Sequence, residues 1–559
     1  MPVRFSITLP AVVFAVLAPL CSKDAQAQPE IVPTEHRIYD FLHAQRVAGR
    51  LPLYRHEALP LDRKTLQHHL DTLQDVQPEL SGPSQYWLNE FRRELFEPEH
   101  LREQLIGTDG SIELPSGANT EKFLFYHSSD DWRIAISATG IAQFRAAEDS
   151  ASYRGMALVP EGTAQGNYRN LIGFYSSTFN GNQFGGDTRV LKRDPVLAPL
   201  YYIDRLEQPA GSFDRSTASF RIANENLSAE IAHERLRLGP AFGQPLLVSN
   251  NADYFSFVKL GLDTRVVQYQ FLHGALGERS TNPLHPDGFI LTAPERYLAM
   301  HRITLQPIPQ AQFSFTEAVV YGLRGPELAY LNPFFPIKPA EHALWDRDNS
   351  LFTLDTTIRP FKGIEVFGAY LVDDLKFDEI GQNSYHYKWA AQGGIAASLD
   401  PVIAGTTGYV EYTRVEPFTY THRFELDGSF YNSYLHNGYG LGHPLGPNSD
   451  QIEAGLSVWL PFRAHARVSG RYVRRGENFI DEDGQLVNVG GDILDGTQPP
   501  FTEFSKVFLS GDLYKGAGVS VDVTVEPIRG VAFRLFGDYQ RWDRDDNELF
   551  VRGELRVTI

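Results

Sequence analysis

The C-terminal half of the chain contains two long polar inserts that combine flat aromatic rings with amide and carboxylate groups. They run from about 323 to 349 and from about 416 to 451. Their ring-bearing candidates are Tyr330, Phe334, Trp345, Tyr434, His436 and Tyr439. Aromatic faces can stack on the C–H faces of sugar rings, while planar polar side chains hydrogen-bond to hydroxyl groups. The inserts therefore favour binding of a carbohydrate.

Basic side chains in and near these inserts could bind acidic sugars, because guanidinium and ammonium groups pair with carboxylates. The candidates are Arg324, Lys338, Arg347, Arg474 and Arg475. The aromatic candidates also have a second interpretation, since membrane-spanning barrels place tyrosine and tryptophan at both membrane interfaces. Packing in such a girdle or within a loop therefore stays open for each ring.

Catalytic and metal-binding patterns are weak in this sequence. Asp373 and Asp374 are adjacent, and neighbouring side chains on an extended chain point apart. His68 and His69 likewise cannot both reach one metal ion from one face of a helix. Two acidic stretches, about 479–490 and 543–548, lack the ligands or the turn glycine that a calcium loop needs. We expect a protein that is not an enzyme and that uses no cofactor or metal.

The inserts belong to a regular alternation of short turns and long connections. From about residue 307 onward, short turns containing proline lie near 307–309, 360–363, 400–401, 461–462 and 527–530. Long inserts lie between them, at about 323–349, 373–386, 416–451 and 475–503. Bacterial outer-membrane barrels have short turns on one side and long loops on the other. The asymmetry predicts a mainly β fold, a transmembrane antiparallel β-barrel of about 18 strands.

Apolar and polar residues alternate along the strand-like runs, for example in 519–526 and 549–559. The apolar face fits lipid, and the charged face fits a wet lumen. We expect strands to begin near 132, 167, 200, 216, 226, 254, 265, 295, 310, 350, 363, 387, 405, 452, 464, 504, 530 and 547. The run 504–526 is too long for one strand, so part of it belongs to the preceding loop or contains another hairpin. A soluble β-sandwich or propeller with a helical cap is the alternative fold.

The N-terminal part of the chain has a different pattern. Residues 1–27 combine Arg4, an apolar run and a small-residue site at Ala27, which is typical of a secretory signal peptide. Apolar residues at helical spacing predict three short helices within 34–106. We therefore divide the chain into a signal peptide (1–27), a periplasmic segment with a small α-helical bundle (28–118) and an outer-membrane barrel (119–559). The single cysteine, Cys21, would be removed with the signal peptide.

Four motifs resemble the capsule assembly Wzi family. In chain order they are Tyr330 to Phe334 (Tyr-Leu-Asn-Pro-Phe), Asp373-Asp374, Tyr409 to Thr413 (Tyr-Val-Glu-Tyr-Thr) and Gly440 to Asn448 (Gly-Leu-Gly-His-Pro-Leu-Gly-Pro-Asn). The likeness spans most of the chain and is sharpest from about 297 to 475. It implies an eighteen-stranded outer-membrane barrel with a small periplasmic helical bundle. It also implies a lectin that attaches exported capsular polysaccharide to the cell surface.

The leading hypothesis is a monomeric outer-membrane barrel in contact with membrane lipid. Inward side chains and the N-terminal helices would block its lumen, and its loops would hold a capsular polysaccharide or exopolysaccharide. A formal net charge of −18 speaks against a nucleic-acid partner. A porin-like diffusion channel is the alternative function, and it requires an open pore. An outer-membrane hydrolase is a third possibility, for which the sequence offers no catalytic grouping.

Overall fold

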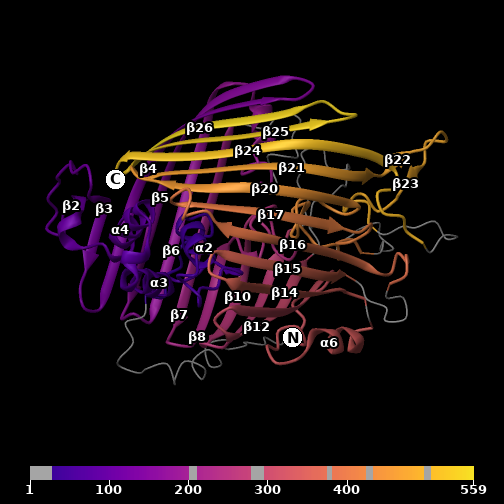
Figure 1. The fold of residues 1–559 in the computed structure, drawn as a ribbon, viewed down its shortest axis with the longest axis horizontal. Helices are drawn as coiled ribbons and strands as arrows, with labels where there is room; N and C mark the ends of the chain where they lie inside the picture. Colours follow the sequence, from indigo (N-terminus) through magenta and orange to yellow (C-terminus); the bar gives the residue numbers. More distant parts are fainter. Residues whose placement is uncertain are drawn as a thin grey trace, which may run out of the picture.

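The strands of the chain close into one antiparallel barrel, shown in Figure 1. The computed structural model describes residues 28–200, 211–277, 295–345, 347–373, 381–422, 432–496 and 505–559. Within these ranges, eighteen strands form the wall, and β26 pairs with β4 to close it. The predicted signal peptide lies outside the described residues. In the described part of the chain, no helix is long and apolar enough to cross a membrane.

The wall strands follow one another around the barrel in sequence order, each paired with the next. They are β4 (Trp132–Glu148), β5 (Ser152–Tyr168), β6 (Ile172–Gly186), β7 (Ser212–Ala223), β8 (Leu227–Glu234), β10 (Phe255–Asp263), β11 (Val267–Leu276), β12 (Arg296–Ile308), β13 (Ala311–Gly322), β14 (Asn349–Phe361), β15 (Ile364–Asp373), β16 (Lys388–Ser398), β17 (Thr406–Val415), β20 (Ser449–Leu460), β21 (Ala464–Glu477), β24 (Asp512–Ile528), β25 (Val531–Trp542) and β26 (Glu548–Thr558). Two further strands, β2 (Arg102–Ile106) and β3 (Glu121–Ser128), extend the sheet beside the start of β4.

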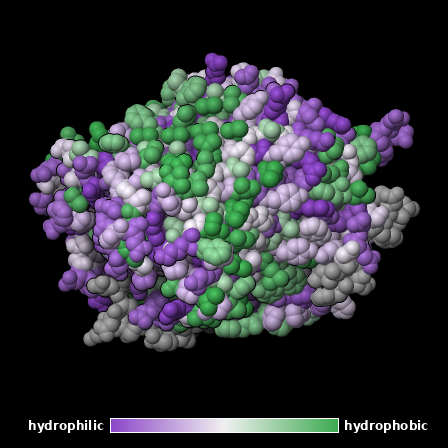
Figure 2. All heavy atoms as spheres, in the orientation of Figure 1, coloured by the Kyte–Doolittle hydropathy of each residue, from purple (hydrophilic) through white to green (hydrophobic). Residues whose placement is uncertain are grey.

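The period-two pattern sorts side chains between the two faces of the wall. On β21, Val468 and Tyr472 are exposed, while His465, which points to the other face of the same strand, is buried. On β26, Leu555 and Val557 are exposed and Arg552 is buried. Figure 2 shows apolar side chains gathered across the middle of one face of the molecule, with hydrophilic ones toward both ends. This is the distribution that a lipid-facing wall with a polar interior requires.

The expected strand number is confirmed, but two of its members were placed wrongly. The chain makes a hairpin of β4 and β5 through residues 149–151, which the prediction counted as one strand. Conversely, the wall strand expected near 200 was wrong, because β6 and β7 pair directly with each other and leave no place for a wall strand between them. The long run near 504 is one strand, β24, preceded by loop residues. The five short turns and four long inserts lie between strands as expected.

Between residue 28 and the barrel, three α-helices and a short strand close the end that carries the short turns, here called the short-turn end. They are α2 (Ile38–Val47), β1 (Ala58–Leu59), α3 (Arg63–Asp75) and α4 (Gly82–Phe96). The Asp62 side chain begins α3 by accepting a hydrogen bond from the Thr65 amide at 2.8 Å. Trp87 of α4 donates its indole N–H to the Leu460 carbonyl beside a short turn, and its ring packs on Trp459 at 4.9 Å. We call residues 28–101 the plug.

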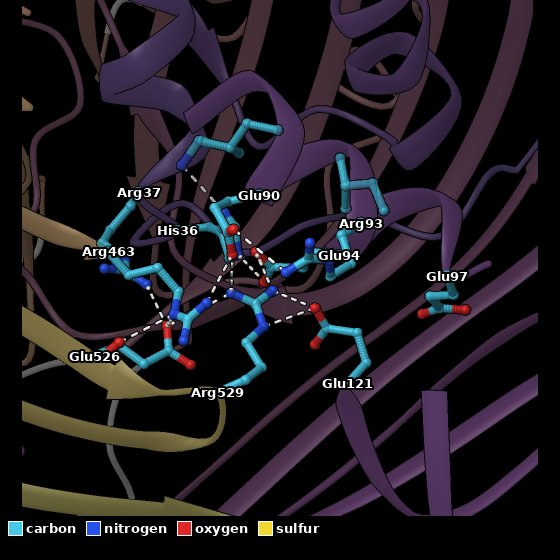
Figure 3. Close-up of polar contacts among 12 residues, drawn as sticks. His36, Arg37, Glu90, Arg93, Glu94, Glu97, Glu121, Arg463, Glu526 and Arg529 are labelled. Carbon is cyan, nitrogen blue, oxygen red and sulfur yellow. Dashed lines mark hydrogen bonds and ion pairs between the residues drawn. The ribbon is translucent and has the colours of Figure 1, made fainter. Parts of the chain in front are cut away.

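Buried ion pairs attach the plug to the wall. The Arg46 guanidinium donates to the Glu57 and Glu365 carboxylates, each at 2.7 Å, and it is fully buried. A second cluster, shown in Figure 3, brings plug carboxylates against arginines of two short turns. There Arg463 contacts Glu90 at 3.2 Å, and the Arg529 guanidinium reaches Glu121 of β3 at 2.7 Å. Because either partner alone would be a buried charge, the plug and the turns hold each other in place.

A segment from the other end also occupies the lumen. Strand β8 is short, and the chain leaves the wall after Glu234 and returns at Phe255. Between them, β9 (Arg237–Leu238) pairs with β1 of the plug. The ring of Phe242 stacks on His43 of α2 at 4.1 Å. Residues 235–254, here called the inward segment, therefore reach down the interior to the plug.

Candidate functional site

The end of the barrel opposite the plug, here called the loop end, is closed by a loop that bonds to the inward segment. The Tyr420 hydroxyl donates to the Leu246 carbonyl at 2.7 Å, and the Tyr434 hydroxyl donates to the Leu247 carbonyl at 2.8 Å. The Ser249 amide donates to the Leu441 carbonyl at 2.8 Å. All three partners of the loop are buried. An apolar cluster continues from the wall through the inward segment into this loop, so the loop packs on the inward segment at this end of the barrel.

The Tyr-Val-Glu-Tyr-Thr motif lies on β17 and fixes the tip of the inward segment. The buried Glu411 carboxylate accepts the Phe242 amide at 3.0 Å, while the ring of Tyr409 stacks on Phe242 at 5.2 Å. Asp373 is also buried, and its carboxylate accepts the Tyr420 amide at 2.5 Å. These carboxylates have structural partners, as do the residues of the Gly440 to Asn448 motif. Asn448, for example, donates to the Gly476 and Ser510 carbonyls.

Two of the predicted contact residues are buried in this closure, and a third, Tyr330, is buried in the insert after β13. Tyr434 is fully buried and His436 nearly so. His436 accepts the Gly277 amide at its Nδ1 atom, and its Nε2 atom lies 3.1 Å from the Tyr254 carbonyl. Burial lowers the pKa of His436 to about 3, so the imidazole is neutral at physiological pH. Tyr330 is also buried and donates its hydroxyl to Asp348 at 2.8 Å.

The basic candidates have carboxylate partners. Arg324 bonds to Asp348 through both terminal nitrogens, and Lys338 contacts Glu341 at 2.7 Å. Arg474 bonds to Asp450 at 2.9 Å and 2.5 Å on the outer face of the rim. Arg475 lies 3.4 Å from Glu477 and keeps a third of its side chain exposed. Their charges are therefore largely compensated before any ligand binds.

The remaining candidates lie at or near the surface. Phe334 is 88% exposed, Trp345 is 90% exposed, and Arg347 is exposed beside them in sequence. They belong to the insert after β13, whose helical part (Ile337–Ala343) contacts β13 and β14. Tyr439 is partly buried against the loop-end cluster. The structure thus separates the predicted contact residues into a buried group and a lateral group, and their contact with sugar stays a prediction.

A half-exposed aromatic and basic group lies inside the rim at the loop end. The Arg475 guanidinium is 5.8 Å from the ring centre of Trp542, and Arg475 is the cross-strand partner of Tyr514. Gly516 separates these side chains on β24, and a Cβ there would lie 2.5 Å from the Trp542 ring. Glycine at this position therefore makes room for the indole. We call Arg475, Tyr514 and Trp542 the rim group.

Of the rim group, sequence reasoning identified only Arg475. Trp542 and Tyr514 follow the period-two pattern on β25 and β24, so their inward direction was readable from the sequence. Their proximity depends on strand register, which spacing along one strand does not reveal. In the described part of the chain, no group of three or more histidine, cysteine, aspartate or glutamate side chains could hold a metal ion.

The sequence matches the family model of the capsule assembly protein Wzi over residues 133–547. The chain belongs to the Wzi family. Among solved structures, Wzi of Escherichia coli, titled an outer-membrane protein of group 1 capsule assembly and a carbohydrate-binding β-barrel, is similar with 12% identity and a TM-score of 0.58. That match covers 94% of this chain and 99% of the other, and it shows a shared fold.

More distant barrels also match the chain. OccAB4 of Acinetobacter baumannii has 9% identity and a TM-score of 0.43, covering 78% of this chain and 99% of its own. OprD of Pseudomonas aeruginosa has 9% identity and a TM-score of 0.41, covering 76% and 95%. No curated protein sequence matches the chain. Membership of the Wzi family and the closed barrel place the protein in the bacterial outer membrane.

Proposed function

We propose that this Wzi-family barrel is a lectin that binds exported capsular polysaccharide or exopolysaccharide and attaches it to the cell surface. The observation that carries the proposal is the filled lumen. The plug, the inward segment and the closing loop occupy the interior in succession. This arrangement fits a protein that binds polysaccharide at its surface and does not fit a diffusion channel. The E. coli protein of the same family is described as carbohydrate-binding, which supports the same role here.

We infer that sugar binds at the rim group. Trp542 and Tyr514 offer ring faces for stacking, and Arg475 offers hydrogen-bond donors beside them. Acidic side chains surround the group, for example Glu477 at 3.4 Å from Arg475. A sugar there would be held by stacking and hydrogen bonds, and no bond-breaking role follows from these residues. The plug would face the periplasm and the rim group the outside, with residues 1–27 removed on export.

Capsule retention in a strain that lacks the protein tests this function. We expect polysaccharide to be made and exported but released into the medium, and retention to return when the native gene is restored. Cell-bound and released polymer are measured separately by uronic acid or total sugar assay. If the deleted strain keeps its polymer on the cells, the attachment proposal is wrong.

A further inference from the structure

The insert after β13 folds back along the outer surface of the barrel. It contains α6 (Ile337–Ala343), and α6 contacts β13 and β14. In Figure 1, α6 lies at the margin of the barrel toward the loop end. We call residues 323–345 the lateral flap.

The alternation of β13 shows which face of the wall the flap covers. Ala318 and Val320 belong to the inner apolar cluster, so they point into the barrel. Val319 and Tyr321 therefore point outward, and both are fully buried against the flap. Closer to the short-turn end, Phe313 and Phe315 have the same outward direction and are exposed. The flap thus begins where the exposed apolar belt of this strand ends.

Polar contacts hold the flap on this outward face. The Glu317 carboxylate accepts the Ile337 amide at 2.8 Å, and the Tyr269 hydroxyl donates to the Pro333 carbonyl. Tyr269 also lies 3.0 Å from His301, which points outward on β12. Such groups would be costly next to lipid tails without partners. The flap supplies some of these partners and buries His301.

The flap exposes a set of large apolar side chains. These six are Leu323, Leu328, Leu331, Phe334, Phe335 and Trp345. Trp345 follows α6 with a φ of 73°, a left-handed conformation that is uncommon for a bulky residue. At 90% exposure, this indole packs on little of the described part of the chain. Arg347 is exposed two residues later.

We propose that the lateral flap is a lipid-binding surface that enters the outer leaflet beside β12 and β13. The exposed flap residues continue the belt formed by Phe313 and Phe315, so one membrane surface would cover both. Aromatic rings next to an arginine are suited to the boundary between acyl chains and anionic head groups. The proposal does not depend on sugar binding, because it concerns the side of the barrel and not its mouth.

Depth measurement by electron paramagnetic resonance tests the flap. Single nitroxide labels are placed at Phe334→Cys and Trp345→Cys in a Cys21→Ser background, and the protein is reconstituted in phosphatidylcholine vesicles. Phe315→Cys serves as the lipid-exposed reference, and Ile480→Cys, exposed on the loop-end strand β22 (Phe479–Ile480), serves as the aqueous reference. Collision rates with oxygen, which enters lipid, and with a nickel chelate, which stays in water, are compared.

We expect both flap labels to show an oxygen-to-nickel collision ratio several-fold above that at Ile480 and close to that at Phe315. Ratios equal to those at Ile480 would overturn the proposal, and protection by added polysaccharide would then assign the flap to sugar. Spin–spin broadening that disappears on dilution with unlabelled protein would instead mean that a second copy covers the flap, which also overturns it. Both labelled positions are exposed, so the folded barrel tolerates the change.

Discussion

At the scale of single residues, a change in the rim group should weaken ligand binding, whereas a change in the buried ion pairs should weaken the stability of the fold. Trp542→Ala removes one stacking face that is half-exposed and outside the ion-pair clusters. We expect affinity for the polysaccharide to fall about fivefold to tenfold, because one aromatic stack contributes about 1 kcal/mol beyond area burial. Fluorescence titration or surface plasmon resonance with purified polymer measures the change.

The matched control for this prediction is Trp132→Ala. Trp132 is an exposed tryptophan at the start of β4, at the short-turn end, so its removal should leave affinity unchanged. Equal loss of binding in both variants would show that the rim group is not the sugar site.

Arg46 joins α2 to β15 of the wall through the Glu365 carboxylate, and its second partner, Glu57, belongs to the plug; all three side chains are buried. Arg46→Met leaves Glu57 and Glu365 without this partner, so we expect the free energy of unfolding to fall by about 3–5 kcal/mol. Arg92→Met serves as the control, because Arg92 pairs with an exposed Asp71 on the plug surface and should cost less than about 1 kcal/mol. Guanidinium unfolding in detergent, followed by tryptophan fluorescence, gives both values, and similar losses would contradict the expectation.

At the scale of elements, the contact between β3 and the short turn that carries Arg529 should depend on pH. Burial, reinforced by the nearby Glu94 carboxylate, raises the pKa of Glu121 to about 7, although Arg529 opposes the rise. Glu121 lies on β3, outside the wall strands. Between about pH 4.5 and 7, the Glu121 carboxyl is therefore protonated in the folded protein but ionised in the unfolded chain. The stabilisation that the raised pKa of Glu121 gives the folded state is fully present below about pH 4.5 and is lost as the pH rises through about 7.

We therefore expect the melting temperature in detergent to be lower at pH 8 than at pH 6, and Glu121→Gln to reduce that difference. Calorimetry of the native protein and the variant at both pH values measures it. The same difference in both proteins would assign the pH dependence to another group.

The closing loop holds the inward segment through two tyrosine hydroxyls. The double variant Tyr420→Phe and Tyr434→Phe keeps both rings but leaves the Leu246 and Leu247 carbonyls without these donors. Each lost partner should cost about 1–3 kcal/mol. We expect amide hydrogen exchange in residues 238–249 to become at least tenfold faster, while exchange in the β4–β5 hairpin serves as the internal control. Unchanged exchange in the inward segment would mean that other contacts hold it.

Some elements could be predicted from the sequence and others could not, for physical reasons. Proline turns such as Pro461-Phe462 and helical spacing such as Leu66, Leu70 and Leu73 are local signals, and both are confirmed. The β4–β5 hairpin was missed because its three-residue turn lies at the loop end, where long connections were expected. The inward segment was missed because its partners lie far away in sequence, for example Leu238 against Ala58. The rim group likewise depends on register between strands.

At the scale of the whole molecule, the filled interior should prevent diffusion. We expect the purified protein to give no steady ion conductance in planar lipid bilayers, because the plug, the inward segment and the closing loop occupy the lumen in succession. A diffusion porin of known conductance, measured in the same membrane, serves as the positive control. Steady, reproducible current steps from this protein would favour the channel alternative over the lectin.

The barrel can close only after β26 has been synthesised, because β26 pairs with β4. Its pairs join residues such as Val557 and Gly140, which are made at opposite ends of the synthesis of the barrel. The plug is made before any wall strand, yet one of its anchors, Arg529, is among the last residues translated. Pairings of such long sequence separation form slowly. The nascent chain must therefore wait with its first helices unanchored until the last wall strands have been made.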